Sequence, residues 1–214
     1  MMPSSSASQV QGALPFDSCV KVGTVQDGAQ GSDPGTRRIC VFAGSGLGSR
    51  QAYQEAARDL GEELARRGLG LVYGGACVGL MGEVADAALQ AGGEVIGVVP
   101  QGVWSEEANH PGLTIRHEVG TMHERKALMA ELADGFLALP GGLGTFDELC
   151  EILAWAQLGL SCKPIGLLNI AGYFQPFLQL VAAAVREGFI AQNPPLLISD
   201  GVKVGMLLDL LLQG

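Results

Sequence analysis

The chain has 214 residues, of which 48% are apolar, and a formal net charge of −9. This length suits one α/β domain with a substantial core. The acidic balance argues against nucleic acid and anionic membranes as partners, because both attract basic surfaces. No apolar run is long enough to span a membrane. An anionic small ligand is still possible, because the charge around a site decides what that site binds.

The cysteines and histidines predict no metal site. The chain has five cysteines and three histidines. None of them forms a C-x-x-C pair or a helical histidine motif, which are the usual spacings of metal ligands. The odd number of cysteines and the lack of a signal peptide favour a reducing, cytoplasmic location.

Residues 1–36 differ in composition from the rest of the chain. They are rich in Ser, Gly, Gln and Asp and show little periodicity, which predicts a flexible tail. A transit peptide is the alternative, but such peptides are rich in Arg, and this stretch has one Lys and no Arg. Residues 37–214 are then expected to form a single Rossmann-like domain without an internal repeat.

Two junctions of strand, glycine turn and helix open this domain. An apolar strand at 38–43 is followed by a glycine-rich turn from Gly44 and a helix over 51–67. A second strand at 70–73 leads into Gly74-Gly75 and another helix. The first turn matches neither the dinucleotide fingerprint nor a Walker loop.

The next strand, at 95–99, ends in a long polar loop over 101–113 that contains Glu107. Strands that are apolar throughout are typical of a parallel sheet covered on both faces. In open parallel sheets, ligands bind at the carboxyl ends of the strands. The loop therefore lies where a ligand is expected, although Glu107 fits a solvated carboxylate equally well.

A cation interrupts the apolar face of the helix predicted over 121–133. Met122 belongs to that face, and Arg125 falls in its middle, with Lys126 at its flank. A buried cation needs an anionic partner. That partner is either a core carboxylate or a ligand phosphate, and we favour the phosphate because arginine suits its planar recognition.

The densest glycine turn follows the apolar strand at 135–139. It reads Pro140-Gly-Gly-Leu-Gly-Thr-Phe-Asp-Glu148 and leads into a long apolar helix. Glycines before a helix start expose unpaired N–H groups to an anion, most often phosphate. Thr145 and Glu148 also fit a capping box, which would give both residues a structural role.

The remaining elements complete an α/β pattern. Strands are predicted at 164–168 and 196–198, and helices at 174–187 and 202–212. The alternation predicts a Rossmann-like, doubly wound, mostly parallel sheet of about seven strands with helices on both faces. The helix over 149–160 is apolar almost all round, so one side is expected to meet a second subunit. We therefore predict a homodimer or a larger oligomer.

The glycine turn resembles the PGGxGTxxE signature of the LOG ("lonely guy") family, and Arg125-Lys126 resembles the family's upstream Arg-Lys pair. This resemblance implies that Arg125 and Glu148 are catalytic. It also implies contacts to the substrate or its phosphate from ten further residues, namely Ser45, Gly74, Gly75, Glu107, Met122, Lys126, Gly141, Gly142, Gly144 and Thr145.

The family consists of phosphoribohydrolases that activate cytokinins. The resemblance therefore implies hydrolysis of the N-glycosidic bond of an adenine-type nucleoside 5′-monophosphate, without a cofactor. Such a reaction needs a carboxylate near the developing positive charge on the ribose, and we expect the helix-start donors to keep Glu148 ionised. Two alternatives are a general purine nucleoside monophosphate nucleosidase and a non-catalytic carrier of a nucleotide or of molybdenum cofactor.

Overall fold

A single seven-stranded parallel sheet organises the computed structural model, which describes residues 35–102, 108–190, 196–199 and 204–213. The strands are β1 Arg38–Phe42, β2 Gly70–Tyr73, β3 Val95–Pro100, β4 Ile115–Val119, β5 Gly135–Ala138, β6 Ile165–Leu168 and β7 Leu196–Ser199. The helices are α1 Gln51–Arg66, α2 Gly79–Gln90, α3 Met122–Leu132, α4 Leu143–Gln157, the 3₁₀ turn η2 Ile170–Gly172, α5 Gln175–Arg186 and α6 Val204–Gln213.

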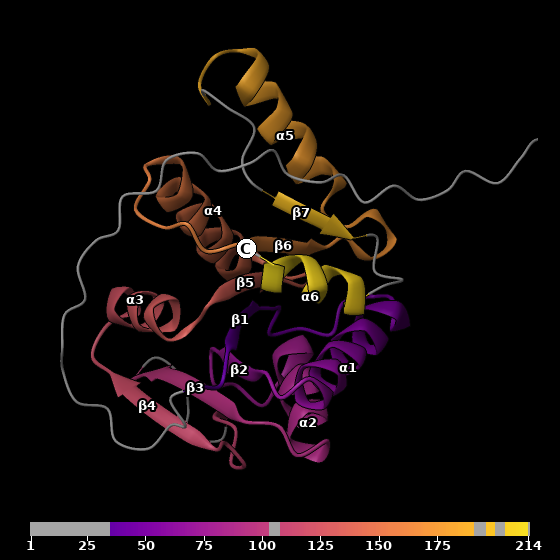
Figure 1. The fold of residues 1–214 in the computed structure, drawn as a ribbon, viewed down its shortest axis with the longest axis vertical. Helices are drawn as coiled ribbons and strands as arrows, with labels where there is room; N and C mark the ends of the chain where they lie inside the picture. The colour runs from indigo at the N-terminus through magenta and orange to yellow at the C-terminus, as the bar shows by residue number, and fades with distance from the viewer. Residues whose placement is uncertain (1–34, 103–107, 191–195, 200–203, 214) are drawn as a thin grey trace, which may run out of the picture.

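The strand order is β4-β3-β2-β1-β5-β6-β7, and every neighbouring pair is parallel. The prediction of a doubly wound parallel sheet of about seven strands is confirmed. Because β1 lies between β2 and β5, the chain winds outward to β4 and then returns to the other side of β1 (Figure 1). This reversal places a topological switch point between the ends of β1 and β5, where ligands bind in open sheets.

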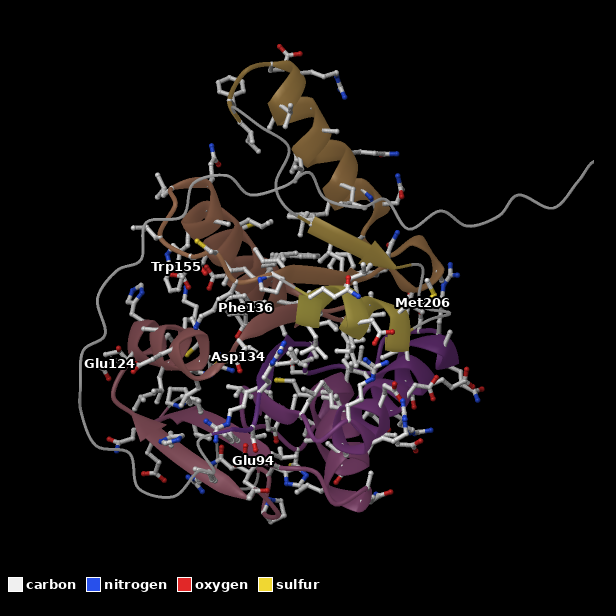
Figure 2. All side chains as sticks on the ribbon, in the orientation of Figure 1. Glu94, Glu124, Asp134, Phe136, Trp155 and Met206 are labelled. Carbon is white, nitrogen blue, oxygen red and sulfur yellow. The ribbon has the colours of Figure 1, made fainter. Side chains whose placement is uncertain are left out.

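Alternate residues of β1 enter two apolar layers. Ile39 and Val41 pack in a cluster with α1, α2 and α6, whereas Cys40 and Phe42 pack in a second cluster with α3 and α4. Figure 2 shows the side chains that fill both layers, with Phe136 of β5 in the middle of the molecule. Since both faces are covered, no strand of the sheet interior alternates with polar residues.

Helix α5 stands apart from the body of the molecule (Figure 1). It has no buried residue, and Leu180 on it is 68% exposed. The predicted tail over 1–36 lies outside the described residues except for its last two positions, and Glu107 lies outside them as well. Within the described residues, no helix is both long and apolar enough to cross a membrane.

Candidate active site

Three glycine turns meet at the carboxyl edge of the sheet. The N–H of Gly44, after β1, donates to the carbonyl of Pro140, after β5, at 3.1 Å. A Cβ placed on Gly44 would lie 3.0 Å from the Cα of Gly141. The turn after β2 is equally close, because a Cβ on Gly79 would overlap the backbone of Ser45. The backbones therefore touch at positions where no side chain fits.

The third turn leads into α4 earlier than predicted. Helix α4 begins at Leu143, with Gly142 as its N-cap and no side-chain hydrogen bond at the cap. The capping box, which was the alternative role for Thr145 and Glu148, is therefore not formed, because the helix has already begun before Thr145. The extended backbone of Gly142 serves as the cap, and buried Thr145 instead fills the space beside Gly141.

The start of α4 presents unpaired donors. The N–H groups of residues 142–145 have no acceptor in the described part of the chain. They gather at the positive end of the helix dipole, beside the switch point of the sheet. This arrangement suits an anion such as a phosphate group.

The two residues expected to be catalytic form a buried ion pair. Nη1 of Arg125, from α3, donates to Oε1 of Glu148, from α4, at 3.1 Å. The two residues are only 4% and 8% exposed. Nε of Arg125 also donates to the carbonyl of Val98 at 3.1 Å, and its guanidinium lies where a side chain at Gly74 would be. The core carboxylate that the sequence left as an alternative partner for Arg125 is therefore Glu148 itself.

Burial changes the acidity of Glu148. Loss of hydration raises its pKa to about 7, and the nearby charge of Asp147 adds to the rise. Arg125 and Lys126 act in the opposite direction without cancelling it. The expectation that helix-start donors keep Glu148 ionised is wrong, because its described donor is the Arg125 guanidinium rather than the backbone of the turn. At neutral pH the carboxyl group is close to its midpoint.

Lys126 links α3 to α4 beside this pair. Its Nζ lies 3.0 Å from Oδ2 of Asp147 and 3.2 Å from Oε2 of Glu151. Burial lowers the pKa of Lys126, but these two ion pairs outweigh that effect and raise it above its ordinary value. The side chain is 11% exposed and already has two carboxylate partners.

The other residues named from the sequence fall into two groups. Gly74 and Gly75 are buried beneath the site, whereas Ser45 is exposed on the turn after β1. Met122 is 39% exposed at the start of α3. Gly142 and Gly144 are exposed at the start of α4. The structure thus brings the predicted turns and both charged residues to the carboxyl ends of the strands.

Tyr173 was not found from the sequence. It lies between η2 and α5, and its hydroxyl donates to the carbonyl of Gly141, 32 residues away. No local pattern signals such a contact, because it arises only when β5 and β6 lie side by side.

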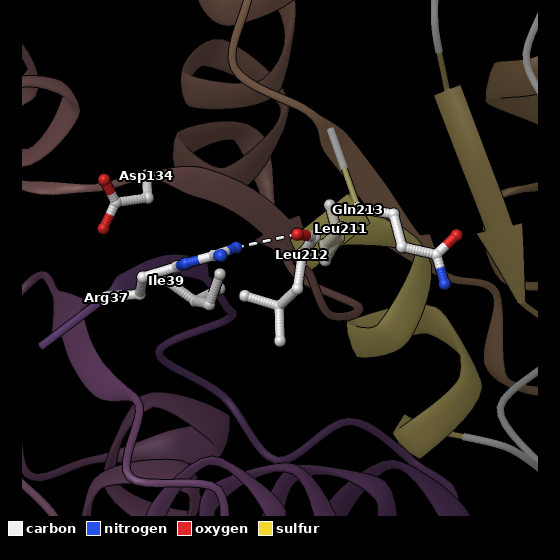
Figure 3. A pocket seen from close by; sticks show the side chains of 6 residues that line it. All are labelled: Arg37, Ile39, Asp134, Leu211, Leu212 and Gln213. Atoms are coloured by element: carbon white, nitrogen blue, oxygen red, sulfur yellow. Dashed lines mark hydrogen bonds between the residues drawn. The ribbon is translucent and has the colours of Figure 1, made fainter.

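A separate cavity of about 400 Å³ lies at the amino-terminal ends of β1 and β5 (Figure 3). Its lining includes Arg37, which precedes β1, and Asp134, which precedes β5, so it is remote from the glycine turns. Among the described residues, no group of three or more His, Cys, Asp or Glu side chains could hold a metal ion.

Comparison with known proteins identifies the relatives of this chain. A family model described as "Possible lysine decarboxylase" matches residues 81–199. The probable cytokinin riboside 5′-monophosphate phosphoribohydrolase LOGL9 of Oryza sativa is 53% identical over 154 residues, which cover 72% of this chain and 68% of that protein. Rice LOG is 51% identical over 157 residues, covering 73% of this chain and 65% of its own length. Arabidopsis thaliana LOG3 is 49% identical over 155 residues, or 72% of each chain. The chain thus spans about two thirds of the length of these rice relatives.

Solved structures with the same fold are more distant in sequence. The molybdenum cofactor binding protein of Rippkaea orientalis gives a TM-score of 0.62 at 23% identity, covering 83% of this chain and 97% of its own. The molybdenum cofactor carrier protein of Chlamydomonas reinhardtii has a TM-score of 0.61 at 23% sequence identity. The match covers 84% of this chain and 99% of the carrier protein. At this identity the likeness shows the fold alone.

Two findings establish the family: the family model that matches residues 81–199, and the relatives with about 50% sequence identity. The residues matched by the family model include the glycine turn before Glu148 and the helix that carries Arg125. The chain belongs to the family described as possible lysine decarboxylase, the LOG family of cytokinin riboside 5′-monophosphate phosphoribohydrolases.

Proposed function

We propose that the protein hydrolyses the N-glycosidic bond of an adenine-type nucleoside 5′-monophosphate, as in cytokinin activation, and releases the free base and ribose 5-phosphate. The observation that carries this proposal is the buried pair of Arg125 and Glu148 beside the unpaired amides of α4. The relatives at 49–53% identity are named for this activity.

The 5′-phosphate binds the N–H groups of residues 142–145. One phosphate accepts several of these donors, and the helix dipole stabilises its charge. This contact places the ribose near Glu148, one and a half turns into the same helix, whose side chain leans back toward the N-terminus.

Glu148 acts on the ribose carbon that loses the base. As the bond to the base breaks, positive charge develops on the sugar, and the carboxylate of Glu148 stabilises it. The base leaves with the electron pair of the broken bond. Water then adds to that carbon, Glu148 accepts the proton that the water loses, and the base takes up a proton from solvent. A pKa of about 7 suits a proton acceptor that works near neutral pH.

Arg125 holds this carboxylate in place and favours its charged form, although burial outweighs this effect. Its bond to the Val98 carbonyl fixes the guanidinium, and its bond to Oε1 orients Glu148. We assign the phosphate to the amides of α4 rather than to Arg125, because the Arg125 side chain is 4% exposed and faces Glu148.

The lysine chemistry in the name of the family model finds no support in the two described lysines. Lys126 is held by two carboxylates. Lys163 precedes β6, and its Nζ donates to the carbonyl of Ala130 at 2.7 Å, at the end of α3. That contact satisfies a free carbonyl at the end of α3. It lies near the start of β6, whereas the glycine turns follow the carboxyl ends of the strands.

We further propose a homodimer. Several exposed apolar side chains lie at the end of α4 and on α5, where Leu158 is 71% and Leu180 68% exposed. Leu153, within the segment expected at the interface, is instead buried in the monomer at 9% exposure. The surface that meets the second copy is therefore the end of α4 with α5, rather than the whole of 149–160. The cytoplasmic location stays a prediction.

A hydrolysis panel tests the activity. Wild-type protein is incubated with AMP, its N6-prenyl derivative and the two matching nucleosides, and free base is measured by chromatography. We expect base release from the monophosphates. Release from AMP and the prenyl derivative at equal rates would indicate a general purine nucleosidase. Tight nucleotide binding without base release in any reaction would indicate a carrier and refute the proposal.

A further inference from the structure

The peptide group between Gly141 and Gly142 is conformationally less restrained than other peptide groups of the site. Neither residue has a Cβ, so steric clashes limit the rotation of this peptide group very little. It also borders the unpaired amides of α4. If it turned over, a carbonyl oxygen would replace an N–H beside the bound anion.

The hydroxyl of Tyr173 holds this peptide in one orientation. It donates to the carbonyl of Gly141. In a trans peptide the C=O and the following N–H point in opposite directions. With the Gly141 carbonyl turned toward Tyr173, the N–H of Gly142 points away from it, and Gly142 is exposed. The preceding carbonyl, of Pro140, is held in the same way by the N–H of Gly44.

The ring of Tyr173 is firmly placed. It packs edge-on against Tyr53 of α1, with centroids 5.9 Å apart, and is stacked with Phe146 of α4 at 6.4 Å. It also meets the ring of Phe174 edge-on at 5.2 Å. Tyr173 lies against both apolar clusters of the protein. A donor held by three aromatic neighbours keeps its hydroxyl in a constant position.

The backbone that presents Tyr173 is strained. Ala171 has a φ of 51° and is the only described residue other than glycine with a positive φ. This conformation is costly for a residue with a Cβ. Buried Ile170 on one side and the bond from the Phe174 N–H to Oδ1 of Asn169, at 2.7 Å, on the other keep it in place. Strain of this kind persists where the surrounding structure enforces it, often at functional sites.

We propose that Tyr173 is a positioning residue, which keeps the N–H groups of the glycine turn directed at the substrate phosphate. This inference rests on the proposed function and adds to it a residue outside both signature motifs. Without the hydroxyl, the Gly141–Gly142 peptide samples both orientations, and the share of molecules ready to bind phosphate falls.

The test compares Tyr173→Phe with Tyr53→Phe. Both changes remove one hydroxyl from the same aromatic group, but the Tyr53 hydroxyl has no hydrogen-bond partner among the described residues. Calorimetry measures the Kd for ribose 5-phosphate, which carries the phosphate without the base. We expect Tyr173→Phe to weaken binding about tenfold, the equivalent of one net hydrogen bond, and Tyr53→Phe to leave it within about twofold. KM for AMP should rise by the same factor in Tyr173→Phe, with little change in kcat.

Unchanged affinity in Tyr173→Phe, or equal losses in both variants, would overturn the proposal. The N–H resonance of Gly142 provides a readout that does not depend on the reaction. It should shift or broaden in Tyr173→Phe alone, because the peptide is no longer fixed, while the melting temperatures of the two variants stay close. If the wild type releases no base, the proposed function fails, and the Gly142 resonance still decides whether Tyr173 holds the turn. An unaltered resonance would refute that hold.

Discussion

Replacing Glu148 by glutamine should change how stability depends on pH. Glutamine keeps the shape of the side chain and an oxygen that accepts from Arg125, but it cannot ionise. In the wild type, burial raises the pKa of Glu148 from 4.5 to about 7. Between these values the folded protein keeps a proton that the unfolded chain releases. The free energy of unfolding of the wild type therefore falls as pH rises through this window.

The size of the effect follows from the same values. A rise from 4.5 to about 7 corresponds to about 3 kcal/mol, at about 1.4 kcal/mol for each pH unit. This is a large part of a domain stability of roughly 5–15 kcal/mol. The glutamine variant lacks this titration. Its free energy of unfolding, measured relative to the wild type, should therefore increase by up to about 3 kcal/mol between pH 4.5 and pH 8.

Urea unfolding at pH 5, 6, 7 and 8, followed by circular dichroism, measures this difference. All other titrating groups are common to both proteins, so they cancel in the comparison. A difference that stays constant within about 0.5 kcal/mol over this range would show that burial does not hold a proton on Glu148. In the same variant, base release should fall on the order of 100-fold or more. A well-folded variant with near wild-type turnover would remove Glu148 from the mechanism.

Four further expectations concern other parts of the protein. Arg125→Ala removes the described hydrogen-bond donor of the Glu148 carboxyl, so the pKa of Glu148 should rise further. The kcat/KM should therefore fall on the order of 100-fold at pH 7 and recover partly at higher pH. An unchanged pH profile would contradict this. AMP should be hydrolysed several hundred-fold faster than adenosine, from two or three charge-assisted hydrogen bonds of roughly 1.5–3 kcal/mol each, and comparable kcat/KM values would exclude the phosphate site at α4. Leu158→Asp with Leu180→Asp should split the oligomer in light scattering, and a monomeric wild type at micromolar concentration would disprove the dimer. Deleting residues 1–36 should leave activity and melting temperature nearly unchanged, whereas a large loss of folded protein would mean that they pack on the domain.

The inner part of the sheet could be predicted because strands such as β2, β3 and β5 are continuous apolar runs that end at or near a glycine or a proline. The predicted strand at 70–73 has the observed bounds, and β5 ends one residue before the prediction. The start of α4 could not be placed as well. Thr145 and Glu148 satisfy the spacing of a capping box, but Gly142 already has the extended conformation that an N-cap needs. Spacing shows which side chains are able to cap a helix, and it does not show where the backbone turns.

The sequence indicated that Arg125 is a buried cation and that the glycine turns lie at the carboxyl ends of the strands, but it did not indicate how these residues contact one another. The position of Arg125 in an apolar face indicated a buried cation with an anionic partner. Its pairing with Glu148, 23 residues away, depends on how α3 and α4 cross the same face of the sheet. The acidity of Glu148 depends on that burial as well, so the protonation state predicted from sequence was wrong. Tyr173 has no sequence signal, because its contact joins the segments that follow β5 and β6, and these two strands are neighbours only in the folded sheet.

Gly74 has neither a side chain nor a charge, yet the geometry of the Arg125–Glu148 pair depends on it. The guanidinium of Arg125 occupies the volume that any side chain at this position would need. A single methyl group there would push the arginine away from Glu148 while leaving every ionisable residue of the chain in place. The Arg125–Glu148 ion pair therefore depends on the absence of a side chain at position 74 as well as on its two partners. Gly74→Ala would separate the two residues without altering the protein's net charge.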